Sequence, residues 1–409
     1  MQLYHISDWL LDIAFLLYVL ASVVFVVAMT GKKWSGRDPK QHEQRYGRIG
    51  YWMAVVGFVA QTGYVITRWI AGGHSPTSNM FEFMAFLDYC IILAYLIIYR
   101  IYKLTVIGAF VLPLGVIMLA YSYVFPKEIT PLIPSLQSYW LYIHVTTAAL
   151  GEGILAVGFA AGLMYLIMTV PQKVSTKSTK WLEVVLAVVL MLVGFILMES
   201  TYARLDQRTV FEVTQPATAP QTGEQKVEVE YTLPAIVAPA DSTLVKEGPM
   251  SPLFTAPAWM EGKDAARKLN TMIWSVLSGL VLYGILRLVL RKRLAAAIQP
   301  ALDDIDPNLV DEISYRAISI GYPVFTLGAL IFAMIWANEA WGRFWGWDPK
   351  EVWALIVWLF YSAYLHLRLS RGWIGAKSAW MSVIGFVIIL ITLVVVNLVI
   401  AGLHSYAGV

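Results

Sequence analysis

Long apolar runs separated by short polar segments dominate this chain. Most runs are close to the 20 or so residues that an α-helix needs to cross a bilayer. The pattern predicts an all-α, polytopic membrane helix bundle of about ten transmembrane helices. The expected spans are residues 9–29, 49–70, 80–100, 104–125, 139–169, 181–200, 271–290, 316–337, 353–369 and 379–402.

Composition agrees with this class and excludes several functions. The chain is 58% hydrophobic and only 14% charged, far more apolar than a soluble domain. A net charge of +3, without a basic patch interleaved with aromatics, predicts no nucleic-acid partner. Neither GxxxxGK[ST] nor GxGxxG occurs, so we expect no ATP-driven step on this chain. Cys90 is the single cysteine, which excludes an internal disulfide and a CxxC redox pair.

The distribution of basic residues predicts the orientation. Nineteen Lys and Arg residues lie in alternate connections, whereas the short connections on the other side hold only Arg68, Lys127, Arg343 and Lys350. The positive-inside rule therefore places both termini outside the cytoplasm. Residues 1–8 carry no Lys or Arg, so we expect the first run to remain as a span rather than to be a cleaved signal peptide.

One connection, residues 201–270, differs in composition because seven prolines interrupt it. It is expected to be an external loop or small cap without a core of its own, with a short strand over 226–233, where polar and apolar residues alternate. The predicted organisation is a four-span bundle, a span with an external histidine, a span pair that carries this loop, and a tryptophan-rich region, over residues 1–132, 133–180, 181–290 and 305–409.

The tryptophan-rich run WGRFWGWDPKE, residues 341–351, is the most informative motif. Trp341, Trp345 and Trp347 place three indoles within seven residues. Indoles are flat and polarisable, so they suit stacking on a large flat ligand such as a porphyrin. Asp348 fits a helix N-cap, followed by Pro349 and Glu351 in a capping-box pattern. The other tryptophans near the run, Trp336, Trp353 and Trp358, are interpreted as belt or core residues.

Three histidines could bind a metal. His144 and His404 are predicted at the external membrane level of the tryptophan run, where two imidazoles could supply both axial ligands of a heme iron. His366 lies in the ninth span, roughly 25 Å deeper, and would belong to a separate site. The alternative for each is an interfacial anchor. His5, His42 and His74 are interpreted as solvated loop residues.

Three acidic residues fall in or beside predicted spans: Glu82, Asp88 and Glu152. A charge in lipid is unfavourable, so these side chains should face protein or water. Glu82 could accept a hydrogen bond from an imidazole. Hydrogen bonding between helices explains all three equally well.

These motifs together resemble CcsA/ResC-type cytochrome c biogenesis proteins, which belong to the heme-handling superfamily with a tryptophan-rich "WWD" domain. The resemblance covers residues 75–166 and 305–409. The motifs that carry it are SNMFE at 78–82, PSLQSYWLYIHV at 134–145, WANEAW at 336–341 followed by DPKE at 348–351, YLHLR at 364–368 and GLHSY at 402–406. Family members usually have two spans between the first external histidine and the tryptophan run, whereas four are counted here.

The resemblance implies a cytochrome c synthase subunit that carries heme b to the outer membrane face. There it would present heme for thioether attachment to the CxxCH motif of apocytochrome c. It implies external heme ligation by His144 and His404 beside the tryptophan shelf and Asp348, and a second heme site at His366. A CcsB/ResB-type membrane partner is expected, and a thiol-reducing protein acts indirectly. Arg343 and Lys350 are candidates for propionate contacts, or are surface charges.

Other classes fit part of the pattern. A b-type electron-transfer subunit would retain its heme, a heme exporter would need no apocytochrome, and a structural subunit would bind no cofactor. Whether the chain is itself an enzyme is left open, although it is expected to be part of a holocytochrome c synthase complex. The expected location is the bacterial plasma membrane, with the heme site on the extracytoplasmic face, and the thylakoid membrane is the alternative.

Overall fold

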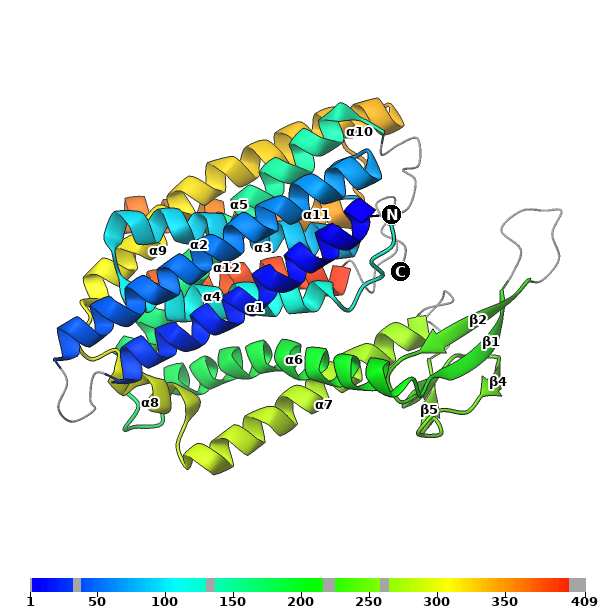
Figure 1. Cartoon of the computed structure of the whole chain (residues 1–409), viewed down its shortest axis with the longest axis horizontal. Helices are drawn as coiled ribbons and strands as arrows, with labels where there is room; N and C mark the ends of the chain where they lie inside the picture. Colours follow the sequence, from blue (N-terminus) through cyan, green and yellow to red (C-terminus); the bar gives the residue numbers. More distant parts are fainter. Residues whose placement is uncertain (1, 32–37, 130–136, 216–224, 258–264, 397–409) are drawn as a thin grey trace. The chain divides into compact units, whose positions relative to one another are not determined.

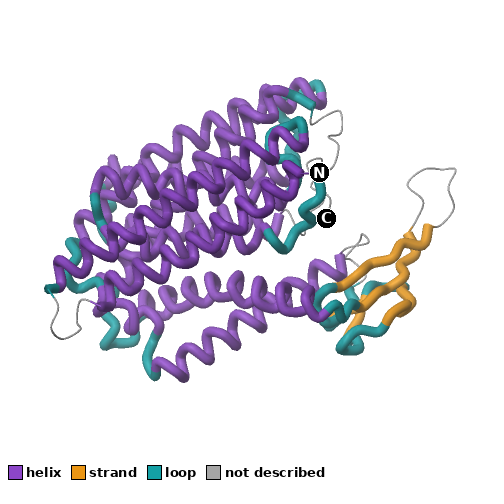
Figure 2. Tube along the Cα trace, in the orientation of Figure 1, coloured by secondary structure: helices purple, strands orange, loops and turns teal. Residues whose placement is uncertain are grey.

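The computed structural model describes residues 2–31, 38–129, 137–215, 225–257 and 265–396 (Figure 1). The chain forms two compact units. The first comprises Met1–Val174 and Ala295–Val409, and the second is Ser175–Leu294. Helices make up the first unit, whereas the second adds strands to a pair of long helices (Figure 2).

The structure confirms the membrane helix bundle. Ten helices in the described part of the chain are long and apolar enough to cross a membrane, one for each expected span. Seven of these are α1 (Gln2–Thr30), α2 (Pro39–Gly72), α3 (Met80–Tyr102), α4 (Thr105–Ser122), α5 (Tyr139–Thr169), α6 (Lys177–Leu205) and α7 (Ala265–Leu290). After the short α8 (Leu294–Ile298) and η3 (Gln299–Ala301), the eighth span runs through α9 (Pro307–Phe325), η4 (Thr326–Phe332) and α10 (Ala333–Trp341). The last two are α11 (Pro349–Arg371) and α12 (Ala376–Leu390), which continues into η5 (Ile391–Val396).

Helix α5 lies at the centre of the first unit, packed against α3, α9, η4 and α12. In its most apolar stretch, 78% of the residues are buried inside the protein, the largest share among the candidate spans. Glycines permit this packing. A Cβ added at Gly151 would lie 2.6 Å from Phe325 Cα, and one at Gly153 would lie 2.8 Å from the Cys90 carbonyl carbon. Lipid supplies no hydrophobic drive between helices, so such backbone-to-backbone approaches are what hold these helices together.

The eighth span changes its winding midway. Pro323 near the end of α9 has no N–H to donate to the preceding turn. Just after it, the seven residues of η4 adopt a π-helix. The wider turn faces α5, and Gly328 within it packs so closely that a Cβ there would lie 2.6 Å from Ala148 Cα. π-Helical turns of this kind are frequently found at functional sites.

Two buried acidic residues of the first unit, Glu82 and Asp88, are paired with side chains from other segments. Arg68 on α2 donates through Nε to Glu82 Oε1 at 2.8 Å, and both side chains are 1% exposed. The backbone N–H and the hydroxyl of Ser78 donate to the other oxygen of Glu82. Gln61 donates to Asp88 Oδ2 at 2.9 Å. The side chain of Glu82 is therefore paired with an arginine and a serine. Pairing of this kind is what makes a buried charge tolerable.

Two of the histidine interpretations were wrong. His42 and His74 are each only 6% exposed, so they are buried rather than solvated. Each ring lies 3.0 Å from a backbone carbonyl, Val27 O for His42 and Ser75 O for His74. His5 is exposed, as expected, but it lies in α1 rather than in a loop. The partner of His42 comes from a neighbouring helix and leaves no signature in the local sequence, whereas His74 contacts the carbonyl of the next residue.

The expectation that residues 201–270 lack a core was also wrong. Strand β1 (Thr209–Gln215) pairs antiparallel with β2 (Gln225–Tyr231) and β4 (Ser242–Lys246). A second, parallel pair joins β3 (Val237–Ala238) and β5 (Phe254–Thr255). The apolar core beneath the strands consists of Phe211, Val213, Val229, Tyr231, Ala235 and Ala238. The strand expected at 226–233 is confirmed as β2.

Helix α7 anchors this small β-layer. Asn270 is buried and accepts a hydrogen bond from Ile236 N at 2.8 Å, while its own amide donates to Pro234 O. Trp274, one turn further on, donates through Nε1 to the same carbonyl at 2.8 Å. The β-layer is therefore tied to the start of a membrane helix.

The orientation stays a prediction, and the chain allows a clean test of it. Its one cysteine, Cys90, is 2% exposed, so an introduced cysteine can be labelled selectively. Lys173→Cys and Lys246→Cys both fall on exposed positions. We expect a membrane-impermeant maleimide to label Lys246→Cys in intact cells, and Lys173→Cys only after permeabilisation. The reverse pattern would invert the proposed topology.

The approach of η4 to α5 predicts a specific sensitivity to side-chain size. Gly328→Leu would force the two helices apart, and overpacking of this kind is unfavourable by about 1–3 kcal/mol. We expect a lower melting temperature for the purified protein in detergent. Gly284→Leu on α7 is the matched control, because no described atom lies within 4 Å of a Cβ there. Equal melting temperatures for the two variants would show that the contact is not tight.

Candidate functional site

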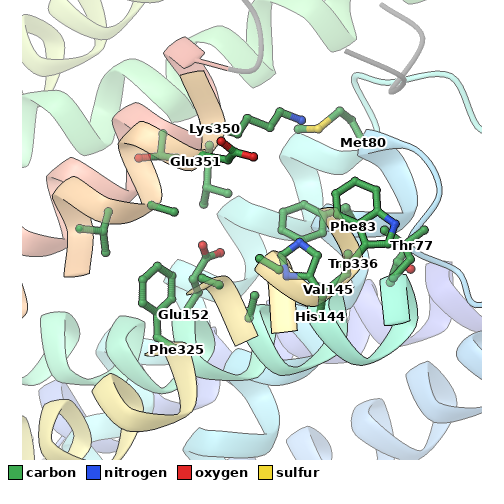
Figure 3. Close-up of a pocket in the computed structure, with 18 of the residues that line it drawn as sticks. Thr77, Met80, Phe83, His144, Val145, Glu152, Phe325, Trp336, Lys350 and Glu351 are labelled. Carbon is green, nitrogen blue, oxygen red and sulfur yellow. The ribbon is translucent and has the colours of Figure 1, made fainter. Parts of the chain in front are cut away.

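A cavity of about 220 Å³ opens between segments of the first unit that are far apart in sequence (Figure 3). The residues before α3 and its first turns form one wall, α5 a second, the eighth span a third, and the start of α11 with η5 the rest. Most lining side chains are apolar. The principal polar groups are Thr77, Ser78, His144, Glu152, Lys350 and Glu351. An apolar cavity with a few convergent polar groups is the usual form of a ligand site.

His144 is held in one orientation within this cavity. Its Nδ1 lies 2.9 Å from Gly328 O, on the π-helical turn. A carbonyl can only accept, so Nδ1 donates in this contact, and a neutral ring would have its lone pair on Nε2. Metal-binding histidines are usually oriented in this way, by a hydrogen bond from the other ring nitrogen. The structure thus places this sequence-predicted residue in a cavity, with a carbonyl partner at Nδ1.

Trp336 supports the histidine from behind. The two rings stack with centroids 5.7 Å apart and an interplanar angle of 14°. Trp336 is only 2% exposed, and Trp341 meets it edge-on at 4.8 Å. Sequence reasoning gave Trp336 a belt or core role and missed its place on the cavity wall. A signal was present, since Phe325, Ala329, Ala333 and Trp336 recur at helical spacing and all line the cavity.

The rest of the tryptophan run lies outside the cavity wall. Trp345 and Trp347 contact each other edge-on, with centroids 6.0 Å apart. Trp347 is 70% exposed and adopts a left-handed backbone with φ of 57°. Arg343 is exposed and does not line the cavity. The structure therefore brings Trp341 against the cavity wall and leaves Trp345, Trp347 and Arg343 out of the lining.

The predicted capping box at the start of α11 is confirmed and shapes the loop. Asp348 Oδ1 accepts from Lys350 N at 3.0 Å. Glu351 Oε2 accepts from Asp348 N at 3.1 Å and from Gly346 N at 2.8 Å. These bonds tie the end of the tryptophan run to the first turn of α11. Figure 3 shows the consequence: Lys350 and Glu351 project from that turn, with Lys350 extending toward Met80 across the cavity.

Glu152 lies deeper in the same cavity, beside Phe325 (Figure 3). It follows His144 by eight residues on α5, which is about 12 Å along one helix face. Its Oε2 is buried and has no hydrogen-bond partner among the described residues. The cavity therefore has a histidine at one level and a carboxyl group about two turns away.

His366 does not join this cavity. It lies on α11 about 24 Å along the helix from Lys350, and its side chain is exposed, whereas Tyr361 and Tyr364 on the same helix are buried. His404 lies outside the described residues. Within the described ranges, no group of three or more His, Cys, Asp or Glu residues could by itself hold a metal ion. His144 is the one histidine among the described residues that line the cavity.

Comparisons with known proteins identify the family. The model of a family described as cytochrome c assembly protein matches residues 77–204 and 270–404. These ranges contain α6 up to residue 204 and α7 from residue 270 onward, and leave out 205–269. A cytochrome c biogenesis protein CcsA from Gloeobacter violaceus is 30% identical over 409 residues, 99% of this chain and 97% of the relative. Proteins of the same name from Synechococcus sp. (strain JA-3-3Ab) and Pyropia yezoensis are 30% and 28% identical, over 97% and 85% of this chain and 96% and 83% of their own lengths.

The match extends over the cavity, since the segments that form its walls all fall within the two matched ranges. It also extends over ten candidate membrane spans in nearly full-length alignments. The chain therefore belongs to the cytochrome c assembly protein family, as a polytopic membrane protein with a role in cytochrome c maturation.

Proposed function

We propose that this chain is a cytochrome c synthase subunit that brings heme to the outer face of the membrane. There it presents heme for thioether attachment to the CxxCH motif of apocytochrome c. One observation carries the proposal: His144 lines a largely apolar cavity with its Nδ1 2.9 Å from Gly328 O, so that Nε2 is the ring nitrogen proposed to bind iron. The family's role in cytochrome c maturation makes heme the metal-bearing substrate to test first.

The cavity lining suits heme b. The macrocycle is flat and apolar, and Trp336, Leu141, Val145 and Phe325 offer apolar and aromatic surface around His144. Its carboxylate edge requires a cation, and Lys350 is the cationic side chain among the lining residues. Imidazole for iron, apolar surface for the ring and an ammonium group for a propionate together match the chemistry of the ligand.

The proposal assigns separate roles to the remaining predicted residues. His404 is proposed as the second axial ligand. Trp341 would support the cavity wall through Trp336, while Trp345 and Trp347 would contact the outer edge of the macrocycle or the incoming peptide. Asp348 acts through the capping box, by fixing the turn from which Lys350 projects. Arg343 is proposed only as a peripheral charge.

His366 is proposed to belong to a second heme site on the route from the cytoplasmic side. Its exposure on α11 supports completion of that site by another protein, and we propose a CcsB/ResB-type membrane partner. The reacting thiols belong to apocytochrome c and would be kept reduced by a separate protein, because the one cysteine here is buried. The proposed location is the bacterial plasma membrane, with the cavity on the extracytoplasmic side and the thylakoid membrane as the alternative.

The chemistry asked of the protein is positioning. Each thiol of CxxCH adds across a heme vinyl group: sulfur bonds to one vinyl carbon and the thiol proton ends on the other. An iron held by imidazole ligands fixes the ring and hence the vinyl edge relative to the bound peptide. No nucleophile from this chain is required.

Replacing the proposed ligand tests the function directly. We expect His144→Gly to lower the heme content of the purified protein roughly tenfold or more and to lower holocytochrome yield in parallel. The wild type should show the split reduced spectrum of low-spin heme. Because the substitution leaves a ring-sized gap, imidazole in the medium should restore part of both signals. His5→Gly, at an exposed position, is the matched control.

Three outcomes would point elsewhere. Normal holocytochrome yield from a well-expressed double variant of His144 and His404 would contradict the ligand assignment. Stable heme with no transfer to CxxCH would favour an electron-transfer subunit. A colourless wild-type protein that cannot be reconstituted with heme would contradict heme binding altogether.

We expect different results for Lys350 and Arg343, the two candidate propionate contacts. Lys350 lines the cavity and Arg343 does not. A buried charge-assisted hydrogen bond contributes about 1.5–3 kcal/mol, so Lys350→Gln should weaken heme binding by about ten- to hundredfold. Arg343→Gln should leave the affinity within about twofold, since exposed ion pairs contribute little. Heme titration of both variants measures the difference, and equal effects would remove Lys350 from the proposed site.

A further inference from the structure

Helices α6 and α7 of the second unit cross at a pair of glycines. A Cβ at Gly194 would lie 2.7 Å from Gly279 N, and one at Gly279 would lie 2.6 Å from the Met191 side chain. The two backbones therefore touch at this level. Away from it, toward the start of α6 and the end of α7, the helices diverge (Figure 1).

A second cavity, of about 380 Å³, lies in this diverging part. Its apolar end, nearer the crossing, is formed by Val184, Ala187 and Leu280. Its polar end includes Lys180, Arg287 and Arg293 together with a single carboxylate, Glu183. The cavity thus changes from apolar to cationic over a few helical turns.

Glu183 organises the polar end without neutralising it. One oxygen, Oε2, accepts from the Tyr283 hydroxyl at 2.7 Å and from Leu294 N at 3.2 Å. Arg287 Nη1 lies 3.7 Å from the same atom. The backbone N–H of Lys180 donates to Thr176 O at 3.2 Å, while its side chain lines the cavity. Three cationic side chains facing one carboxylate leave a net positive charge at this end.

The start of α6 adds to this charge. Its N-cap, Thr176, forms a capping box with Thr179, so the helix begins at the polar end of the cavity, between Ser175 and Lys180. A helix N-terminus carries a partial positive charge. The many basic residues in this region also place it on the predicted cytoplasmic side of the membrane.

We propose that this cavity binds an anionic phospholipid of the cytoplasmic leaflet. The phosphate and headgroup would lie among Lys180, Arg287 and Arg293, and an acyl chain would pass Val184, Ala187 and Leu280 toward the glycine crossing. Basic pockets between membrane helices on the cytoplasmic side suit anionic headgroups, because the leaflet is negatively charged and each nearby cation adds attraction. The lipid would fill the space between the diverging helices and hold their ends at a fixed separation.

The test uses the full chain, purified with any partner and then delipidated in detergent. Phosphatidylglycerol and phosphatidylcholine with identical acyl chains are added separately, and bound lipid and melting temperature are measured. We expect phosphatidylglycerol to be retained and to raise the melting temperature more than phosphatidylcholine does. The double variant Lys180→Gln/Arg293→Gln should bind phosphatidylglycerol about tenfold or more weakly, since two attracting cations are removed.

Lys292→Gln is the matched control, because Lys292 is an exposed cation near the same end that does not line the cavity. It should bind phosphatidylglycerol like the wild type. Lys180→Arg keeps the charge and should also bind normally, which separates loss of the site from loss of folding. Equal retention of the two lipids, or unchanged binding by the double variant, would overturn the proposal. Displacement of phosphatidylglycerol by stoichiometric hemin would reassign the cavity to heme propionates and overturn it as well.

Discussion

The contact between α5 and the π-helical turn of the eighth span is the constraint on which the cavity depends. Gly328 has no side chain, so its backbone reaches the backbone of α5 at Ala148. At that separation its carbonyl receives the hydrogen of His144 Nδ1 while also accepting from Ala333 N within the π-helix. One close approach therefore sets both the distance between two cavity walls and the tautomer of the histidine. Trp336, two turns further along the eighth span, then lies flat against the ring.

The same turn explains why the eighth span is irregular. A regular α-helix would commit each carbonyl to the N–H four residues later and would present a narrower surface to α5. Pro323 interrupts that pattern, and η4 follows with its wider winding. A backbone N–H or C=O group without a hydrogen-bond partner is strongly unfavourable in lipid. An irregular helical turn therefore persists only where other protein groups supply hydrogen bonds to it. The imidazole of His144 is one of those groups, which makes the helix irregularity and the ligand orientation parts of one arrangement.

The features of this protein that could be predicted from sequence are those that a short, continuous stretch of residues determines. The thickness of the bilayer requires long apolar runs, so the membrane spans were predicted from the sequence. The start of α11 was predicted as well, because the order of Asp348, Pro349 and Glu351 is itself the signal for a helix start. The wall of the cavity was recovered only in part. Trp341, Trp345 and Trp347 attract notice because they cluster, but Trp336 forms the wall because of its position on a helix face. The β-layer was missed as a folded unit because its core joins short strands across turns and pairs β1 with both β2 and β4.

Two histidines at candidate sites, His144 and His366, are described by the structure, and they differ in how exposed their side chains are. His144 is surrounded by α5, η4 and Trp336, so its polarity is accommodated inside one chain. His366 stands exposed on α11, a helix whose most apolar stretch is only 17% buried. A polar ring at that depth is unfavourable against lipid and becomes acceptable once another polar group, a cofactor or a partner helix covers it. The side chain of His366 therefore lacks the enclosure that the helices of this chain give to His144.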